Sequence, residues 1–149
     1  MDKVEQWLER LEKNGCRRTA PRRAVVEAIT SSLRVLTPIE LFERARKAYP
    51  KLGLVTVYRT LEKLAELGLI QRVHQPSGCQ AFVEAFSGHQ HLLICQQCGR
   101  VEFFNGDSEV MEALIDTVRR QSGYLITDHW LQLFGVCAGC RELPLTETS

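Results

Sequence analysis

The sequence contains no apolar stretch long enough to cross a membrane, because nowhere do about 18 consecutive apolar residues occur. Its first residues also lack the basic start and short apolar segment that are typical of a secretory signal peptide. Lipidation motifs, low-complexity tracts and repeats of solenoid length are absent as well. We therefore expect a cytoplasmic protein that has no membrane partner.

A large excess of either charge is missing too. The 19 Lys and Arg residues against 18 Asp and Glu residues give a formal net charge of +1, which by itself argues against a nucleic-acid partner. The two halves differ, however: residues 1–84 contain 15 basic and 10 acidic residues, and residues 85–149 contain 4 and 8. A +5 half joined to a −4 half predicts a polyanion-binding domain followed by a second domain of another kind.

The basic half is predicted to be a winged helix-turn-helix. Apolar residues at helical spacing predict four helices, over residues 3–14, from Pro21 onward, from the N-cap Thr37 to before Pro50, and over residues 55–67. The third of these is expected to direct Ile39, Leu41, Phe42 and Ala45 inward. Two short runs on either side of residues 76–78 follow and predict a β-hairpin, which would form the wing.

The fourth helix has two unlike faces. At 100° per residue, Val57, Leu61 and Leu64 fall on one side, whereas Thr56, Arg59 and Lys63 fall on the other with Tyr58 beside them. Arginine can bind guanine through two hydrogen bonds in the major groove, and lysine can pair with phosphate. A basic run between residues 13 and 26 adds groups that can reach phosphates or a minor groove. The predicted DNA-binding residues are Arg17, Arg22, Thr56, Tyr58, Arg59 and Lys63, with a solvated helix face as the alternative.

Two Cys-x-x-Cys pairs, Cys95 with Cys98 and Cys137 with Cys140, lie in the acidic half. In a reducing cytosol, paired cysteines favour metal or redox chemistry over disulfides. Four thiolates arranged as a tetrahedron form a closed zinc site that stabilises the fold and leaves no position open for chemistry. Redox use is the competing interpretation, but neither pair lies where a strand passes into a helix as in thioredoxin-like proteins.

The segment between the cysteine pairs predicts a small α+β unit. Residues 89–95 and 100–104 favour strands, and a helix capped by Asp107 and Ser108 ends at Gly123. This helix is expected to bury Val110, Met111, Leu114, Ile115 and Val118, and residues 124–136 are expected to form one or two further strands. A unit of roughly 55 residues is marginal by itself, so we expect both a metal ion and an oligomer interface to stabilise it.

Three histidines and one glutamate form a second candidate metal site. His89 and His91 share one face of a strand, Glu109 falls in the first turn of the helix, and His129 lies on a later strand. Imidazoles with a carboxylate suit zinc, iron or manganese. The alternatives are packed or solvated histidines, and a glutamate placed there by the helix dipole alone. His74, in the wing, is expected to be a surface residue.

With these features in view, the sequence resembles the ferric uptake regulator (Fur) family over nearly its whole length. The features that carry the resemblance are Thr19-Ala20-Pro21-Arg22, the segment GLVTVYRT at residues 53–60, His89 and His91 shortly before Cys95-x-x-Cys98, and His129 before Cys137-x-x-Cys140. The resemblance implies an α+β protein: a winged-helix DNA-binding domain at residues 1–84 and an α/β dimerisation and metal-binding domain at residues 85–149, stapled by a zinc ion on the four cysteines.

The resemblance also implies roles for particular residues. Tyr58 and Arg59 match base-contacting positions, and Arg17 matches a basic residue that enters the minor groove. His89 and His91 match a sensing or dimer-domain site completed by Glu109 and His129. One departure is in the His-rich run that the family has before the first cysteine, where Leu92 stands at a usual ligand position. The others concern the interdomain sensing site, where Val35, Gln71 and Ala85 stand at usual ligand positions. Cys79, His74 and Glu84 lie close enough in sequence to substitute.

The function implied is that of a homodimeric, metal-dependent transcriptional repressor that binds a palindromic operator. Its cofactors would be a structural Zn²⁺ and a second, regulatory divalent ion (Zn²⁺, Fe²⁺ or Mn²⁺). Control of zinc uptake is favoured because nitrogen and sulfur donors outnumber carboxylates, with iron uptake next and peroxide sensing third. The rival classes are a zinc-dependent hydrolase, which would leave the basic half unexplained, and a zinc module for protein partners, which predicts no salt-dependent DNA affinity. We expect no enzyme activity.

Overall fold

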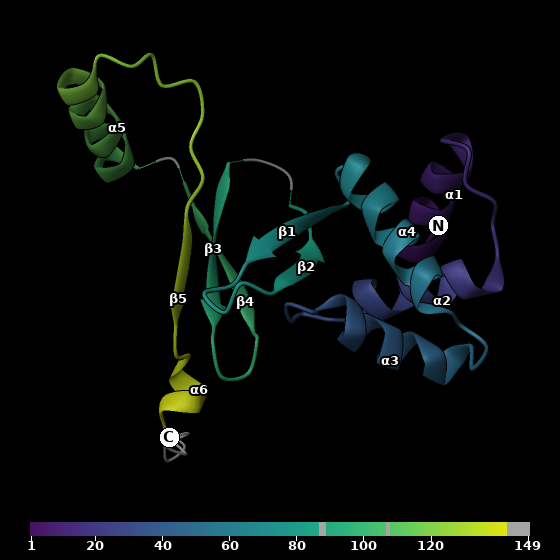
Figure 1. The fold of residues 1–149 in the computed structure, drawn as a ribbon. Helices are drawn as coiled ribbons and strands as arrows, with labels where there is room; N and C mark the ends of the chain where they lie inside the picture. Colours follow the sequence, from purple (N-terminus) through teal and green to yellow (C-terminus); the bar gives the residue numbers. More distant parts are fainter. Residues whose placement is uncertain (87–88, 107, 143–149) are drawn as a thin grey trace. The chain divides into compact units, whose positions relative to one another are not determined.

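The computed structural model describes residues 1–86, 89–106 and 108–142 (Figure 1). The chain divides into two compact units, Met1–Ala85 and Phe86–Ser149. Within the described ranges, no helix has the length and apolar character needed to span a membrane.

The first unit consists of four helices followed by a hairpin. Its elements are α1 (Lys3–Lys13), α2 (Ala20–Thr30), α3 (Pro38–Ala48), α4 (Leu54–Glu66), β1 (Ile70–His74) and β2 (Gln80–Glu84). Side chains cap the starts of three helices: Asp2 accepts from the Glu5 N–H, Thr19 from the Arg22 N–H, and Thr37 closes a capping box with Glu40. These caps explain why the predicted helix starts agree with the structure to within one residue.

A single hydrophobic core lies among the four helices of this unit. Leu8 and Leu11 of α1, Val25 and Ile29 of α2, Leu41 of α3 and Leu61 and Leu64 of α4 are among the residues that form it. The prediction that Ile39 points inward is wrong, because its side chain is 48% exposed. Ile39 is the second residue of α3. The apolar residues that this helix buries in the core include Leu41 and Ala45 instead.

The wing forms one backbone pairing, with the segment before α3, that the sequence does not predict. β1 and β2 form an antiparallel hairpin in which Ile70 faces Glu84 and His74 faces Gln80. Leu36, just before α3, joins β2 through two backbone hydrogen bonds with Phe82, of 3.0 and 2.8 Å. The hairpin is therefore tied to the segment that leads into α3, and through it to the helical core.

The second unit contains a three-stranded sheet. Its elements are β3 (Gln90–Cys95), β4 (Val101–Asn105), α5 (Glu109–Ser122), β5 (Gln132–Gly135) and α6 (Ala138–Arg141). β3 is the central strand, antiparallel to β4 and parallel to β5, and Leu92 faces Gln132 while Cys95 faces Gly135 (Figure 1). Of the segment 124–136 that was expected to contain one or two strands, only residues 132–135 pair, so that expectation is too long by several residues.

α5 corrects the prediction of a buried apolar face. Ser108 caps it and Gly123, with φ +74°, ends it, as expected; the predicted cap residue Asp107 lies outside the described residues. None of its fourteen residues is buried, and Val110, Leu114 and Val118 are 80%, 56% and 41% exposed. The apolar stripe exists, but within its own chain the helix does not pack it against the sheet.

The predicted fold class is confirmed: an α+β chain with a winged helix-turn-helix followed by a small α/β unit that contains four clustered cysteines.

Candidate metal centres and nucleic-acid interface

The two Cys-x-x-Cys pairs come together at one end of the sheet. Cys95 ends β3, and Cys98 lies in the turn that leads to β4, where Gly99 adopts φ +74° and donates a hydrogen bond to the Cys95 carbonyl at 2.9 Å. Cys137, two residues after β5, is the N-cap of α6, and Cys140 lies within that helix. The prediction that neither pair lies where a strand passes into a helix is therefore wrong for this pair. Parallel pairing of β3 with β5 brings the second pair beside the first, so that all four sulfurs lie within 4.8 Å of one another.

The spacing of these sulfurs fits a zinc ion. Four sulfurs at about 2.3 Å from a common centre in a tetrahedron are about 3.8 Å apart. The Sγ atoms of Cys98 and Cys137 are 3.8 Å apart. The four cysteines therefore form the donor set that the expected structural Zn²⁺ requires, and a closed set of this kind holds the fold without doing chemistry.

Backbone groups around the cluster favour thiolate at one sulfur. Burial raises the pKa of the Cys95 thiol, but N–H groups of Cys137, Cys98 and Gln97 directed at its sulfur outweigh burial and lower that pKa to about 6. The Cys137 N–H lies 3.3 Å from this sulfur. Hydrogen bonding with Cys137 and burial raise the pKa of Cys140 to about 12. Because thiolates are the form that binds metal, the raised pKa of Cys140 means that metal binding at this cluster releases its proton.

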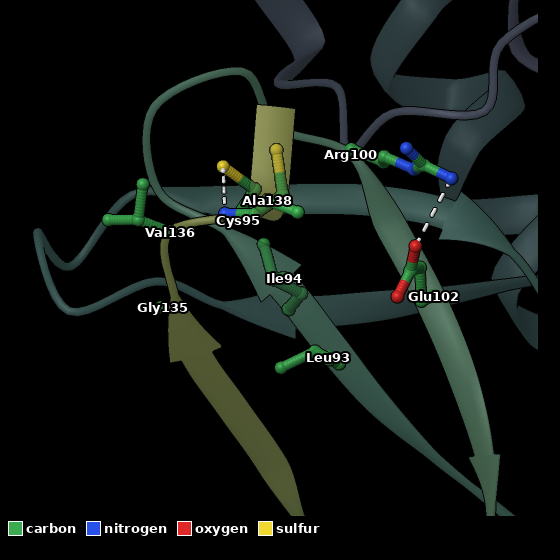
Figure 2. Close-up of a pocket in the computed structure, with 9 residues that line it drawn as sticks. Leu93, Ile94, Cys95, Arg100, Glu102, Gly135, Val136 and Ala138 are labelled. Carbon is green, nitrogen blue, oxygen red and sulfur yellow. Dashed lines mark hydrogen bonds and ion pairs between the residues drawn. The ribbon is translucent and has the colours of Figure 1, made fainter. Parts of the chain in front are cut away.

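A shallow pocket of about 280 Å³ adjoins the cysteine cluster (Figure 2). Leu93 and Ile94 of β3 and Val136 after β5 form its apolar part, and Arg100 and Glu102 form an ion pair of 3.1 Å at another side. Among the described residues, no titratable group other than this pair and the cysteines lines it.

The second donor group lies at the opposite end of β3. His91 is the second residue of that strand and is buried, whereas His89 precedes the strand and is exposed. His129 lies three residues before β5, so the prediction that it lies on a strand is wrong. One ring nitrogen from each of the three histidines lies within 4.8 Å of the others, and the Nε2 atoms of His89 and His129 are hydrogen-bonded at 2.7 Å.

These three imidazoles fit a divalent ion once two of their ring nitrogens move slightly apart. An ion at about 2.05 Å from two nitrogens in a tetrahedral site sets them about 3.3 Å apart, so His89 and His129 must separate by roughly 0.6 Å. His89 is exposed and can make that movement. The structure does not bring the Glu109 carboxylate into this group, and among the described residues Cys79, His74 and Glu84 join neither cluster. Glu84 is instead paired with Lys3 at 2.9 Å.

The predicted DNA-contacting residues of α4 lie on its solvent side. Val57, Leu61 and Leu64 are buried as expected, while Tyr58 and Arg59 are exposed. Thr56 and Lys63 are half-buried, and Lys63 pairs with Glu66 at 3.1 Å. Arg59 forms no ion pair with any described residue, which leaves its guanidinium available to a base or a phosphate.

Much of the basic run between residues 13 and 26 is neutralised by acids of the same unit, which the sequence did not predict. Glu5 of α1 pairs with Arg18 at 2.9 Å and also with Arg23. Lys13 pairs with Glu9 at 3.0 Å, and a guanidinium nitrogen of Arg22 donates to the Arg17 carbonyl. Arg17 is exposed, and within the described part of the chain it forms no ion pair. The acidic residues spaced along α1 are the only feature of the sequence that could indicate these ion pairs, and it is the fold that brings them close to the arginines.

A family model described as the ferric uptake regulator family matches residues 13–134 of this chain. The chain belongs to the ferric uptake regulator family. It is therefore a metal-responsive transcriptional regulator, which confirms the resemblance and the prediction that the chain is not an enzyme.

Relatives from this family match the chain nearly end to end. The ferric uptake regulation protein of Campylobacter jejuni is 31% identical over 142 residues, covering 93% of this chain and 88% of that protein. The peroxide operon regulator of Bacillus subtilis is 28% identical, with 93% and 94% covered. The structure of the Helicobacter pylori ferric uptake regulator Fur has a TM-score of 0.70 at 26% identity, covering 94% of this chain and 95% of that one. Because these relatives are named for different signals, family membership does not identify the metal.

Proposed function

We propose that the chain is a homodimeric, metal-dependent repressor whose residues 1–84 bind DNA and whose residues 85–149 dimerise and bind metal. The observation that carries this proposal is the presence of two separate donor groups at opposite ends of the paired strands β3 and β5, one of four sulfurs and one of three imidazoles. A closed sulfur site supplies stability, and a site with fewer protein ligands can exchange its ion with the surroundings. The second group is thus suited to sensing.

Zinc is the proposed signal, and iron is the main competitor. The second donor group supplies nitrogen from His89, His91 and His129 and no carboxylate. Imidazole suits zinc, whereas manganese prefers sites that include carboxylate or other oxygen ligands. The target genes would then be those of zinc uptake, which the protein would repress when zinc is plentiful.

The metal would act on the DNA-binding unit through the chain that joins the two units. The first unit ends at Ala85, and His89 follows four residues later. An ion held by His89 and His129 therefore anchors the start of the second unit close to the connection. Fixing that connection in each protomer of a dimer would restrict the placement of the two winged helices, which a two-fold operator reads about 34 Å apart.

DNA recognition is proposed to depend on α4 and on the segment before α2. Arg59 and Tyr58 would contact base edges, Thr56 and Lys63 the phosphates, and Arg17 a neighbouring minor groove or phosphate. Arg22 would help to position Arg17, since it already donates to its carbonyl. The freedom of Arg59 and Arg17 from ion pairs with described residues supports this choice over Arg18 and Arg23, which Glu5 holds.

The test is selection of duplexes from a random double-stranded DNA pool by the zinc-loaded protein, followed by affinity measurements on the selected sequence. Affinity is measured against buffered free Zn²⁺, Fe²⁺ and Mn²⁺, with metal counted per protomer. We expect a two-fold symmetric sequence, two ions per protomer, and tight binding only when the second ion is present. Binding that persists after the second ion is removed, with the cysteine zinc retained, would refute the metal switch.

Two arginine variants separate specific recognition from charge. Arg59→Ala should abolish sequence-specific binding, because one bidentate contact to guanine contributes about 1–3 kcal/mol in each half-site. Arg44→Ala removes the same charge from the same unit, but Arg44 lines the groove between α2 and α3. This control should retain binding, and equal losses in both variants would argue against α4 as the recognition helix.

A further inference from the structure

We propose that Gly106 makes room for the ion at the three-histidine site and sets the affinity of that site. The inference rests on the proposed function, since it concerns the same donor group. It adds a positioning residue that carries no donor atom of its own.

Gly106 lies directly after β4 and is buried against His91 of β3 and His89 just before that strand. Its N–H donates to the His89 carbonyl at 3.0 Å, and its carbonyl accepts from the Ser108 N–H at 3.1 Å. A Cβ atom placed on Gly106 would lie 2.2 Å from Cδ2 of His89, 2.6 Å from Nε2 of His91 and 2.8 Å from Nε2 of His89. Two of these three atoms are the nitrogens that would bind the ion.

A methyl group at this position would conflict with the donor atoms themselves. Carbon and nitrogen atoms that are not bonded come no closer than about 3.0 Å without something shifting, and their favourable separation is about 3.5–4.0 Å. The backbone hydrogen bonds on both sides of Gly106 restrain it from moving away. The imidazoles of His89 and His91 would have to turn instead, and a turned ring no longer directs its nitrogen at the ion.

The backbone at Gly106 does not itself demand glycine. The glycines with positive φ in the described chain are Gly15, Gly68, Gly78, Gly99 and Gly123, and Gly106 is not one of them. A larger residue there would therefore meet no backbone strain, and the side-chain space of the metal site is what requires glycine. This separates a role in metal binding from a role in folding.

The test compares Gly106→Ala with Gly135→Ala. Gly135 lies on β5 of the same sheet, and a Cβ there would have nothing within 4 Å, so the control makes the same change without the crowding. Protein whose cysteine site is filled with zinc is titrated with Zn²⁺ against a chelator and with Co²⁺ followed by absorption. We expect Gly106→Ala to weaken the second site at least tenfold, the scale on which residues that orient metal ligands act. Gly135→Ala should match the wild type.

Three results would overturn the inference. If Gly106→Ala binds the second ion as tightly as Gly135→Ala, Gly106 has no effect on the site while the proposed function stands. Loss of helical circular dichroism or of the cysteine zinc in Gly106→Ala would assign Gly106 to folding instead. If His129→Ala, made in the wild-type background, binds the second ion as tightly as the wild type, the proposed site itself is refuted, and the role of Gly106 with it.

Discussion

Replacing Leu114 with serine is expected to weaken the proposed dimer while leaving each protomer folded. Val110, Leu114 and Val118 recur every fourth residue along α5 and remain 80%, 56% and 41% exposed in the single chain. Three large apolar side chains on one helix face are an unfavourable surface to leave in water. A second copy of the chain is the proposed cover, and Leu114 is the central residue of the stripe.

The magnitude follows from the area that Leu114 still exposes. Full burial of a leucine side chain contributes about 1.5–3 kcal/mol, and 56% of the residue is exposed in the protomer. Burying that remainder contributes roughly 1–1.5 kcal/mol, and a two-fold interface contains the residue twice. Leu114→Ser should therefore cost about 2–3 kcal/mol per dimer, which raises the dimer dissociation constant roughly 25- to 150-fold.

Sedimentation equilibrium over a dilution series of zinc-loaded protein measures this constant directly. Leu33→Ser is the matched control, because Leu33 is 85% exposed but belongs to the first unit and not to the apolar stripe of α5. It should leave the dissociation constant at the wild-type value, and circular dichroism should show both variants folded. Equal constants for Leu114→Ser and Leu33→Ser would refute the assignment of α5 to the interface.

Three further outcomes are expected. Cys98→Ser should lose one zinc per protomer and lower the melting temperature of the second unit, whereas Cys79→Ser, at an exposed cysteine outside the cluster, should retain the metal; metal analysis and calorimetry check both. Leu61→Ala, at 1% exposure in the core, should destabilise the first unit by about 2–5 kcal/mol in urea unfolding. The hydrogen bond from Arg23 and the charges of Arg23 and Arg18 lower the pKa of Glu5 below its usual 4.5. The ion pair between Glu5 and Arg23 therefore stabilises the fold above that pH, and its contribution is lost as the pH falls through the lowered pKa. Glu5→Gln should accordingly flatten the acid limb of the stability profile, and an unchanged profile would contradict the ion pair.

Local features of the sequence predicted the elements well. Thr37, Pro38 and Glu40 identify the start of α3 because a capping box depends only on residues three apart, and the structure contains both of its hydrogen bonds. The buried face and the exposed face of α4 likewise follow from helical periodicity alone. The cysteine spacing was sufficient to predict the four-sulfur cluster, since each pair spans a single turn.

Features that depend on distant partners could not be predicted from the sequence. The stripe on α5 was expected to be buried, but periodicity identifies an apolar face without saying which chain covers it. Glu109 begins a helix, which places it in the chain, but the direction in which that helix carries its carboxylate depends on packing that no local pattern encodes. Gly106 carries no distinctive signal in the sequence, because a glycine after a strand is typical of an ordinary turn and its closeness to His91 arises only in the tertiary structure.

β5 has only four residues, and a candidate metal ligand lies on either side of it, His129 before and Cys137 after. Each bound ion adds stability that grows with its free concentration, about 2.7 kcal/mol at a hundred times its dissociation constant. Metal starvation should therefore let this strand open more often, and cellular proteases degrade a protein in proportion to its open population. We expect starved cells to shorten the lifetime of the protein itself, so that repression ends through turnover as well as through release from DNA.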